Sequence, residues 1–186
     1  MILDQFLSHL FFLSRIVERL VLKDHIMPYV PCEQLFNQYG FKRTGSTTAA
    51  LIDVTHTVVT MLETSSYVRY LLIDFLKAFD SGNHIKLVNK LKQHGLNHSI
   101  ITWIVSFLTD RSQYTKVGGN ISRLQFINRF IVQGSGIGPC LFIIMILNLK
   151  ARAATNHMAK YADDAMLLVP ELTSLCIDEE FRFVQK

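Results

Sequence analysis

The chain of 186 residues is 49% hydrophobic and 18% charged, which provides enough apolar material for a sizeable core and excludes a disordered chain. This length suits one domain or one large fragment of a domain. The formal net charge of +4 permits a polyanionic partner such as a nucleic acid but does not require one.

The cysteines and the apolar runs bear on the compartment. Cys32, Cys140 and Cys176 are far apart and form no Cys-x-x-Cys pair, so we expect reduced thiols in a cytosolic or nuclear protein. The apolar N-terminus contains Asp4 and has no basic residue before its hydrophobic stretch, which makes a poor signal peptide. The apolar run 140–149 has about half the length of a membrane span. We therefore expect a protein that is not secreted and has no membrane segment.

The first part of the chain is predicted to form two helices and a strand. Apolar spacing indicates a helix over residues 6–23. A second helix is expected from about Thr48 to Glu63, with Ser46 or Thr47 as its cap. The continuous apolar run 68–75 is rich in β-forming residues and ends near an acid, which is typical of a buried central strand.

The rest of the chain is predicted to contain helices and two hairpins. In chain order these are a helix near residues 85–91 that stops at Gly95, a helix over 99–108, a hairpin over 113–132, a glycine-rich loop over 133–139 that leads into an apolar helix, and two short strands within 160–169. Strands and helices are mixed without a regular β–α–β alternation. This order favours an α+β fold, with helices packed on one face of a mostly antiparallel sheet.

Three aspartates are placed where they would meet. Asp74 ends the predicted central strand, and Asp163 and Asp164 lie at the bend of the last predicted hairpin. If these strands pair, the carboxylates converge, which is costly unless a cation neutralises them. Hard oxygen ligands suit Mg²⁺ or Mn²⁺, and two such ions would assist phosphoryl transfer. For an isolated Asp-Asp pair the alternative is an ordinary turn, because Asp is common in turns.

Five segments, in order, carry a resemblance to a known family. They are QYGFKRTGSTTAAL (38–51), LLIDFLKAFDSGNH (71–84), WIVSFLTDRSQYTKV (103–117), QGSGIGPCLF (133–142) and YADD (161–164). In this order and spacing the chain resembles the reverse transcriptase domain of non-LTR retrotransposons, of the jockey-like LINE type. The resemblance runs from about Ser14 to Val169.

The resemblance implies a polymerase-type palm with part of the fingers. Residues 1–66 would be fingers-like and residues 67–186 a partial palm, within a single domain fragment. Phe130 to Val132 replace the Gly-Val-Pro that usually precedes Gln-Gly-Ser in the family, and the palm motif after YADD is not recognisable. We therefore expect a truncated domain without a thumb.

The activity implied is RNA-directed DNA synthesis. A primer 3′-hydroxyl would attack a dNTP on an RNA template, assisted by two Mg²⁺ (or Mn²⁺) ions, without a membrane or an obligate protein partner. One alternative is an inactive, truncated retrotransposon remnant that at most binds RNA or hybrid duplex. Another is an unrelated palm-like nucleotidyltransferase, which does not explain the fingers and glycine-loop segments.

The resemblance also implies a role for each matching residue. Asp74 and Asp163 would bind both metal ions, Asp164 would complete the acidic triad, and the backbone carbonyl of Phe75 would face the metals. Phe79 would lie under the incoming sugar and select deoxynucleotides. The remaining positions would contact dNTP (Gln133, Lys42 and Arg43) or template and primer (Gly134, Ser135 and Tyr161).

Several of these residues also have simpler interpretations. Phe79 suits a core aromatic, and Lys42 and Arg43 suit a solvated loop. The loop from Gln133 to Ser135 suits a helix-entry turn, which is compatible with binding, because glycine lets the backbone approach a ligand closely.

Overall fold

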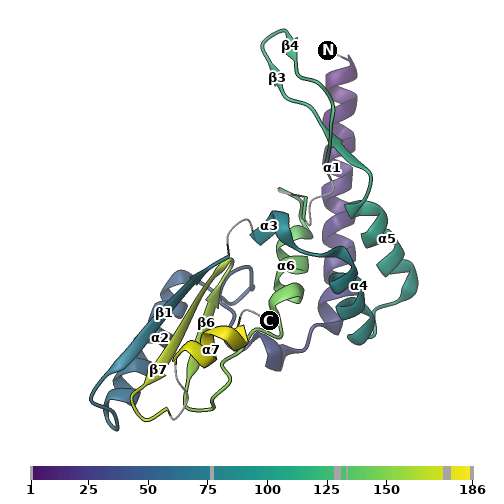
Figure 1. The fold of residues 1–186 in the computed structure, drawn as a ribbon. Helices are drawn as coiled ribbons and strands as arrows, with labels where there is room; N and C mark the ends of the chain where they lie inside the picture. The colour runs from purple at the N-terminus through teal and green to yellow at the C-terminus, as the bar shows by residue number, and fades with distance from the viewer. Residues whose placement is uncertain (1, 76–77, 128–130, 133, 174–176, 185–186) are drawn as a thin grey trace. The chain divides into compact units, whose positions relative to one another are not determined.

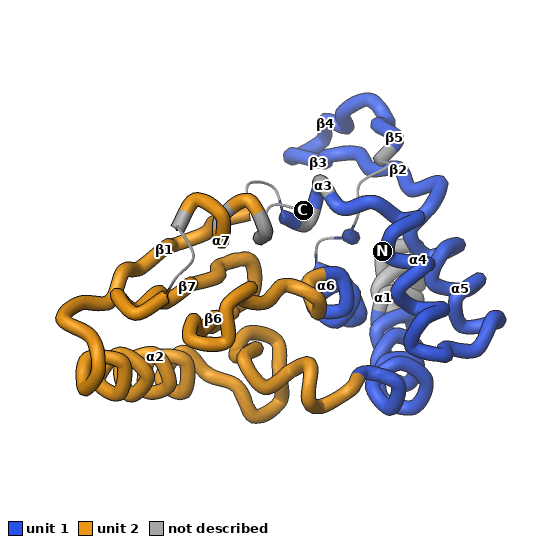
Figure 2. Tube along the Cα trace, turned by 60° about the horizontal axis from the view of Figure 1, so that its bottom comes forward, with its two compact units in different colours: residues 1–30, 77–145 blue, residues 31–76, 146–186 orange. Residues whose placement is uncertain are grey.

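The computed structural model describes residues 2–75, 78–127, 131–132, 134–173 and 177–184 (Figure 1). By its internal contacts the chain forms two compact units, which Figure 2 shows in different colours. The helical unit comprises residues 1–30 and 77–145, and the sheet unit comprises residues 31–76 and 146–186. Both units combine segments from the two predicted parts, so the division into fingers-like and palm-like residues stays a prediction.

The helical unit contains most of the helices and two small antiparallel hairpin ladders. Its helices are α1 (Ile2–Val21), α3 (Ala78–Ser81), α4 (His84–Gln93), α5 (His98–Leu108) and α6 (Gly138–Ile146). Its strands are β2 (Arg111–Gln113), which pairs with β5 (Gln125–Ile127), and β3 (Lys116–Val117), which pairs with β4 (Asn120–Ile121). The helices and the hairpin predicted for this region are confirmed.

Local capping explains where two of these helices begin. The side chains of Asn83 and Asn97 accept hydrogen bonds from Ile85 N and Ser99 N, each at 2.8 Å, and so pair amides that a helix start leaves open. Gly95 follows α4 with φ +77°, a conformation that suits glycine and ends the helix.

The sheet unit is built on a three-stranded antiparallel sheet in the order β1-β7-β6. These strands are β1 (Val68–Asp74), β7 (Asp164–Pro170) and β6 (His157–Tyr161). Helix α2 (Thr47–Leu62) packs on one face, and its N-terminus is capped by Ser46, whose Oγ accepts from Ala49 N at 3.0 Å. The predicted α+β class, the antiparallel sheet and the Ser46 cap are confirmed.

The opposite face of the sheet holds an apolar core. Met158, Leu167 and Val169 are buried there, with Leu71 and Ile73 packed against them. Because side chains alternate between faces along a strand, the residues between these five point toward α2. Burial of this core therefore requires the observed pairing of the strands.

Helix α7 (Ile177–Val184), which the sequence did not predict, lies on the side of the sheet opposite α2 (Figures 1 and 2). Its Glu180 is fully buried and accepts hydrogen bonds from Arg152 N at 3.0 Å, Ala153 N at 2.7 Å and Asn156 Nδ2 at 2.8 Å. One carboxylate thus joins α7 to the loop that precedes β6.

Within the described residues, no helix is both long enough and apolar enough to cross a membrane. Cys32 and Cys140 are free thiols, and burial raises the pKa of the Cys140 thiol to about 12. Cys140 therefore stays protonated at neutral pH and is a poor nucleophile, because the thiolate is the reactive form. Cys176 lies outside the described residues.

The anchoring of α7 is tested by two adjacent glutamates. Glu180→Ala leaves three donors without their acceptor and is expected to lower the free energy of unfolding by about 3 kcal/mol. Glu179→Ala removes only a half-exposed ion pair with Arg152, at 3.6 Å, and is expected to cost about 0–1 kcal/mol. Urea denaturation of both variants measures the difference, and equal losses would contradict this role of Glu180.

Candidate active site

The register of β1 against β7 brings two predicted acids to one end of the sheet. Asp74, the last residue of β1, is the antiparallel partner of Asp164, the first residue of β7. The next residue, Phe75, donates its backbone N–H to the carbonyl of Asp163 at 3.4 Å. Because side chains alternate between the two faces of a sheet, Asp74 and Asp164 lie on the face that carries α2, opposite Ile73 and Leu167. The backbones of all three predicted acids therefore meet at this edge.

Asp163 lies in a two-residue turn. Tyr161 of β6 is the register partner of Asp164, so only Ala162 and Asp163 connect the strands. Ala162 has φ +54°, as the first central residue of a II′-type hairpin turn requires. A left-handed conformation is unfavourable for alanine, so the surrounding structure has to hold it in place.

A backbone segment from the QYGF motif supports this turn from the side of β6. Lys160 N donates to Asn37 O and Tyr39 N donates to Lys160 O, both at 2.8 Å, which makes a short parallel pairing around Gln38. Gly40 then passes directly against the turn, since a Cβ built on it would lie 2.2 Å from Ala162 N. No side chain fits there, so a glycine is required by close approach.

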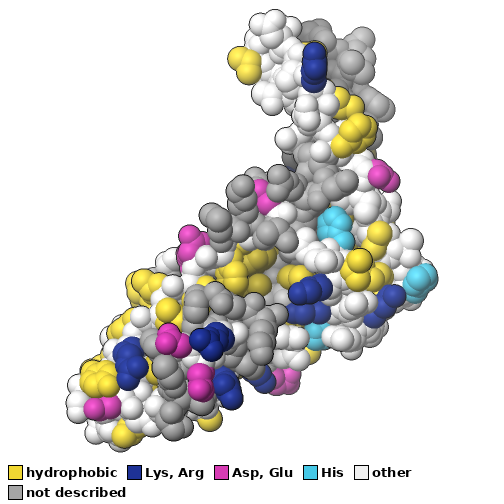
Figure 3. Space-filling view, viewed as in Figure 1, with side chains coloured by type: hydrophobic (Ala, Val, Ile, Leu, Met, Phe, Trp, Pro, Cys, Tyr) yellow, Lys and Arg dark blue, Asp and Glu magenta, His cyan; other side chains and the backbone are white. Residues whose placement is uncertain are grey.

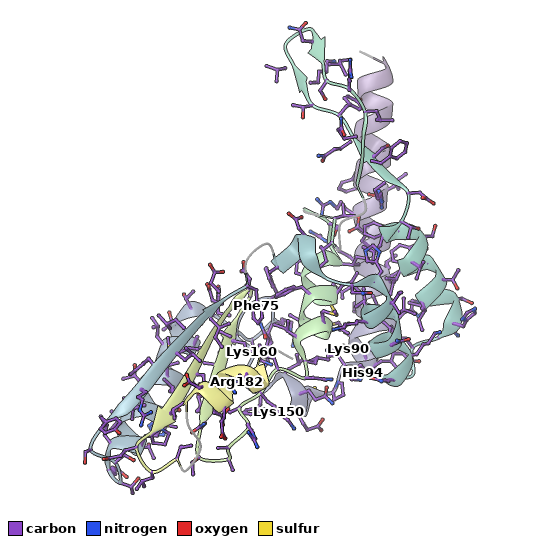
Figure 4. All side chains as sticks on the ribbon, viewed as in Figure 1. Phe75, Lys90, His94, Lys150, Lys160 and Arg182 are labelled. Atoms are coloured by element: carbon purple, nitrogen blue, oxygen red, sulfur yellow. The ribbon has the colours of Figure 1, made fainter. Side chains whose placement is uncertain are left out.

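Two buried polar side chains strengthen the same region. Gln38 is 1% exposed and its Nε2 donates to Gly40 O at 3.0 Å. Lys160 is 2% exposed and its Nζ donates to Leu149 O at 3.1 Å and to Ile146 O at 3.5 Å. Figure 4 labels Lys160 and Phe75 in the sheet unit. Phe75 is the residue that follows Asp74, the last residue of β1.

Helix α2 is fastened to the sheet by a tyrosine, an aspartate and a histidine. His157 Nε2 and Asp53 Oδ2 are 2.7 Å apart, and the Tyr39 hydroxyl hydrogen-bonds the same carboxylate. Burial, this hydrogen bond and the Asp53 charge raise the pKa of Tyr39 from 10.0 to about 12. The stability that the neutral hydroxyl contributes is thus fully present below pH 10.0 and is lost as the pH rises through about 12.

A cavity of about 330 Å³ opens between α2 and the acidic end of the sheet. It is lined by apolar side chains such as Leu51 and Leu72, and it reaches Tyr161 and Asp164. Leu72 is 71% exposed. Figure 3 shows the other side of the sheet unit, where acidic and basic side chains lie among apolar ones. The carboxylate of Asp164 is therefore next to an open apolar surface.

The three acids suit a divalent cation by their chemistry. Asp74 and Asp164 are exposed and Asp163 is partly exposed, so their oxygens are accessible to an ion. Carboxylate oxygens are the ligands that Mg²⁺ prefers. Within the described residues, no group of three or more His, Cys, Asp or Glu side chains is already gathered to hold a metal ion. The backbones of the three acids thus converge, while their side chains are not gathered around one point.

The two basic residues of the segment QYGFKRTGSTTAAL (38–51) differ in their surroundings. Lys42 is partly buried and its Nζ donates to Leu35 O at 3.0 Å, which ties the ammonium to the protein backbone. Arg43 is exposed. Solvent therefore reaches the side chain of Arg43 more freely than that of Lys42.

The glycine loop belongs to the helical unit and is held by α1. Glu18 is 4% exposed, and its carboxylate accepts from Gly136 N and, at 3.4 Å, from Ile137 N. Ser135 Oγ accepts from Gly138 N at 3.0 Å, which caps the entry to α6 as predicted for a helix-entry turn. Gly134 is exposed with φ +79°.

The other predicted site residues are Tyr161, Phe79 and Gln133. Tyr161 is 37% exposed beside Asp164. Phe79 lies in α3, but its side chain falls outside what the structure describes, as does the whole of Gln133. The structure therefore brings Asp74, Asp163, Asp164 and Tyr161 together.

Comparison with known proteins identifies the family. Residues 5–184 match the family described as reverse transcriptase (RNA-dependent DNA polymerase). The chain belongs to the reverse transcriptase family. Reverse transcriptases generally use divalent metal ions.

Curated relatives come from mobile elements. The chain is 26% identical over 182 residues to a probable RNA-directed DNA polymerase from transposon BS of Drosophila melanogaster, covering 91% of this chain and 18% of the relative. It is 28% identical over 179 residues to the RNA-directed DNA polymerase from mobile element jockey of Drosophila funebris, covering 90% and 19%. The chain thus spans about a fifth of these relatives, and the resemblance to non-LTR, jockey-like reverse transcriptases is confirmed.

Solved structures support the fold. A telomerase from Candida albicans, in complex with a TWJ fragment of telomeric RNA, has a TM-score of 0.61 at 15% identity, covering 93% of this chain and 32% of that one. An apo telomerase from Candida tropicalis has a TM-score of 0.57 at 12% identity, covering 96% and 36%. Both agree with a polymerase palm and fingers fold for this reverse transcriptase domain.

Sequence reasoning missed the residues that support the site from a distance. Glu18, Gln38 and Lys160 are buried polar groups whose partners lie in other segments or in the backbone. Of these three, only Lys160 had a signal in the sequence: it lies beside YADD in a predicted strand. A buried lysine in such a strand is unusual.

The tight contact at Gly40 is tested by two glycine substitutions. Gly40→Ala forces a methyl group into Ala162 N and is expected to lower the free energy of unfolding by about 1–3 kcal/mol. It is also expected to speed amide exchange at Tyr39 and Lys160, whose N–H groups form the pairing.

Gly119→Ala is the matched control, because nothing lies within 4 Å of a Cβ at that position. It should leave both measurements almost unchanged. Equal protection of Tyr39 and Lys160 in the wild type and in Gly40→Ala would contradict the proposed support of the turn.

Proposed function

We propose that this reverse transcriptase domain catalyses RNA-directed DNA synthesis at the acidic end of its sheet. The observation that carries the proposal is the register pair Asp74–Asp164, with Asp163 on the adjoining two-residue turn. An apolar hairpin ending in three converging acids is poorly explained by solubility or stability alone. It is well explained by phosphoryl transfer, which needs concentrated negative charge to bind cations.

The proposed metal ligands are the carboxylates of Asp74, Asp163 and Asp164, with the backbone carbonyl of Phe75. Two Mg²⁺ or Mn²⁺ ions bound there would stabilise the attacking and leaving oxygens of the transfer. The protein's own part is to hold its carboxylates on a rigid turn. The strand pairing and the passage of Gly40 against Ala162 support that part.

The chain also has to bind the substrates that the reaction joins. We assign primer contact to Tyr161, which is partly exposed beside Asp164, and template contact to Gly134 and Ser135. Glycine at 134 lets the backbone approach a nucleic acid closely. The Glu18 carboxylate would keep this loop in place through its bonds to Gly136 and Ile137.

The remaining assignments concern the incoming dNTP. Arg43 is exposed and suits a contact to phosphate, with Lys42 and Gln133 as further contacts. Phe79 would form a wall under the sugar that clashes with a 2′-hydroxyl and so selects deoxynucleotides. The partners are thus an RNA template, a DNA primer and dNTPs, and the site of action is the nucleus or the cytoplasm.

The proposal is tested by primer extension on an RNA template with dNTPs and Mg²⁺ or Mn²⁺. Asp163→Asn keeps the shape of the side chain but removes its charge, and is expected to lower incorporation by about 100-fold or more, since metal charge stabilisation is worth several kcal/mol. Asp24→Asn, an exposed aspartate of the helical unit, is the charge-matched control and should retain wild-type incorporation.

Two outcomes would overturn the assignment. Wild-type protein that incorporates no dNTP with either ion would contradict polymerase activity for this chain. Equal incorporation by the wild type and Asp163→Asn would contradict the catalytic role of the acidic turn.

A further inference from the structure

Helix α1 exposes its apolar side chains and buries a charged one. Within residues 12–20, which the structure describes, the buried side chain is Glu18, at 4% exposed. Each apolar residue of this stretch is exposed, with fractions between 40% and 65%: Phe12, Leu13, Ile16, Val17 and Leu20. A helix on the surface of a globular protein normally shows the opposite pattern, with its apolar stripe toward the core. In the described part of the chain, the stripe on α1 is left uncovered.

The exposed residues lie on the side of α1 that faces away from its own unit. At 3.6 residues per turn, Leu13, Ile16 and Leu20 point within about 40° of the direction opposite to Glu18. The Glu18 carboxylate accepts hydrogen bonds from two backbone amides of the glycine loop. These bonds fix the rotation of α1, so the apolar stripe stays on the outside while the loop is bound.

The spacing within the stripe is that of a coiled-coil seam. Steps of three and four residues separate Leu13, Ile16 and Leu20, as between the a and d positions of a heptad. The same steps continue in the sequence to Ile2, with His9 as the one polar position. Figure 1 shows α1 extending past α4, α5 and α6 of the same unit. A helix that projects in this way is stabilised chiefly by a partner that covers its apolar face.

We propose that α1 binds the α1 of a second copy of this chain, side by side and in parallel, so that two chains form a homodimer. Leu13, Ile16 and Leu20 would meet their counterparts in the seam of this helix pair. Across each flank of a parallel coiled coil, a residue faces the one five places further along the other helix. Phe12 therefore faces Val17 of the second copy, and the pair covers all five exposed apolar residues.

Charge complementarity favours a second copy, in the parallel orientation, as the partner. The same spacing of five places Arg19 opposite Asp24 of the second copy, and twofold symmetry forms this pair twice. Both side chains are exposed, and Asp24 lies in η1 (Leu22–Ile26), a π-helical turn that follows α1 directly. Lys23, at the next seam position, is also exposed and ends the apolar stripe. In an antiparallel pair centred on Ile16, the two opposite charges would lie about three helical turns apart.

Sedimentation equilibrium of the 186-residue protein at several concentrations tests the pairing. We expect a reversible equilibrium between one chain and two, without larger species. Ile16→Glu places a charge in the seam and is expected to weaken the dimer at least about 100-fold. Ile85→Glu makes the same change at a 71%-exposed position on α4 of the same unit. This control should change the dimer less than about twofold. Both isoleucines are exposed in the single chain, so circular dichroism should show both variants folded.

A charge swap tests the identity of the partner and the orientation of the helices. Arg19→Glu alone and Asp24→Arg alone each place like charges across both flanks and are expected to weaken the dimer about tenfold. The double variant restores opposite charges and should bind within about threefold of the wild type. Leu20→Cys in a Cys32→Ser background should form a disulfide-linked dimer on mild oxidation, because a parallel seam brings position 20 against itself.

A monomer at every concentration overturns the inference, as do species larger than two chains. Equal dimer strength in Ile16→Glu and Ile85→Glu contradicts a seam on α1. A double charge variant as weak as the single ones, or no crosslink in Leu20→Cys, contradicts the parallel pairing. The seam contains no residue proposed for catalysis or substrate binding. Monomeric protein that incorporates dNTP therefore contradicts this inference alone, and dimeric protein that incorporates none contradicts the proposed polymerase activity alone.

Discussion

The antiparallel register of β1 against β7 is the constraint on which the candidate active site depends. Asp74 faces Asp164 only while Leu71 and Ile73 point into the core formed with Leu167 and its neighbours. A slip of one residue would turn these apolar side chains to the other face and carry Asp74 away from its partner. Hydrophobic burial on one face of the sheet thus determines the position of charge at its end.

Two effects destabilise the folded state at that end. Like charges on Asp74, Asp163 and Asp164 raise the free energy of the folded state, and Ala162 adds the cost of a left-handed backbone. The apolar core and the pairing of Asn37–Tyr39 with β6 hold the arrangement against both. A cation that binds only the folded chain would relieve the repulsion and stabilise the protein by mass action.

Much of this arrangement was predictable from sequence because it is local. In the sequence, strand β1 is an apolar run and the YADD turn is a pair of acids between apolar segments. Ser46 stands where a helix cap is expected. Supporting contacts are different, because they join residues far apart in sequence. Glu18 binds an amide 118 residues away, and nothing near it in sequence points to that partner.

Helix α7 was missed for a related reason. It has only eight residues, and its acidic start, Asp178 to Glu180, is as compatible with an exposed segment as with a helix N-terminus. The burial of Glu180 depends on a loop that precedes β6. Local pattern therefore predicts where the acids gather, and tertiary contacts determine what keeps them there.

Binding of Mn²⁺ shows whether Asp74, Asp163 and Asp164 form one cation site. The signal of free Mn²⁺ in electron paramagnetic resonance falls as the ion binds, and it needs no nucleic acid or activity. We expect the wild type to take up Mn²⁺ in competition with Mg²⁺, and this uptake to be lost when Asp74, Asp163 and Asp164 are all replaced by Asn. Unchanged uptake in the triple variant would contradict a shared cation site at these three acids.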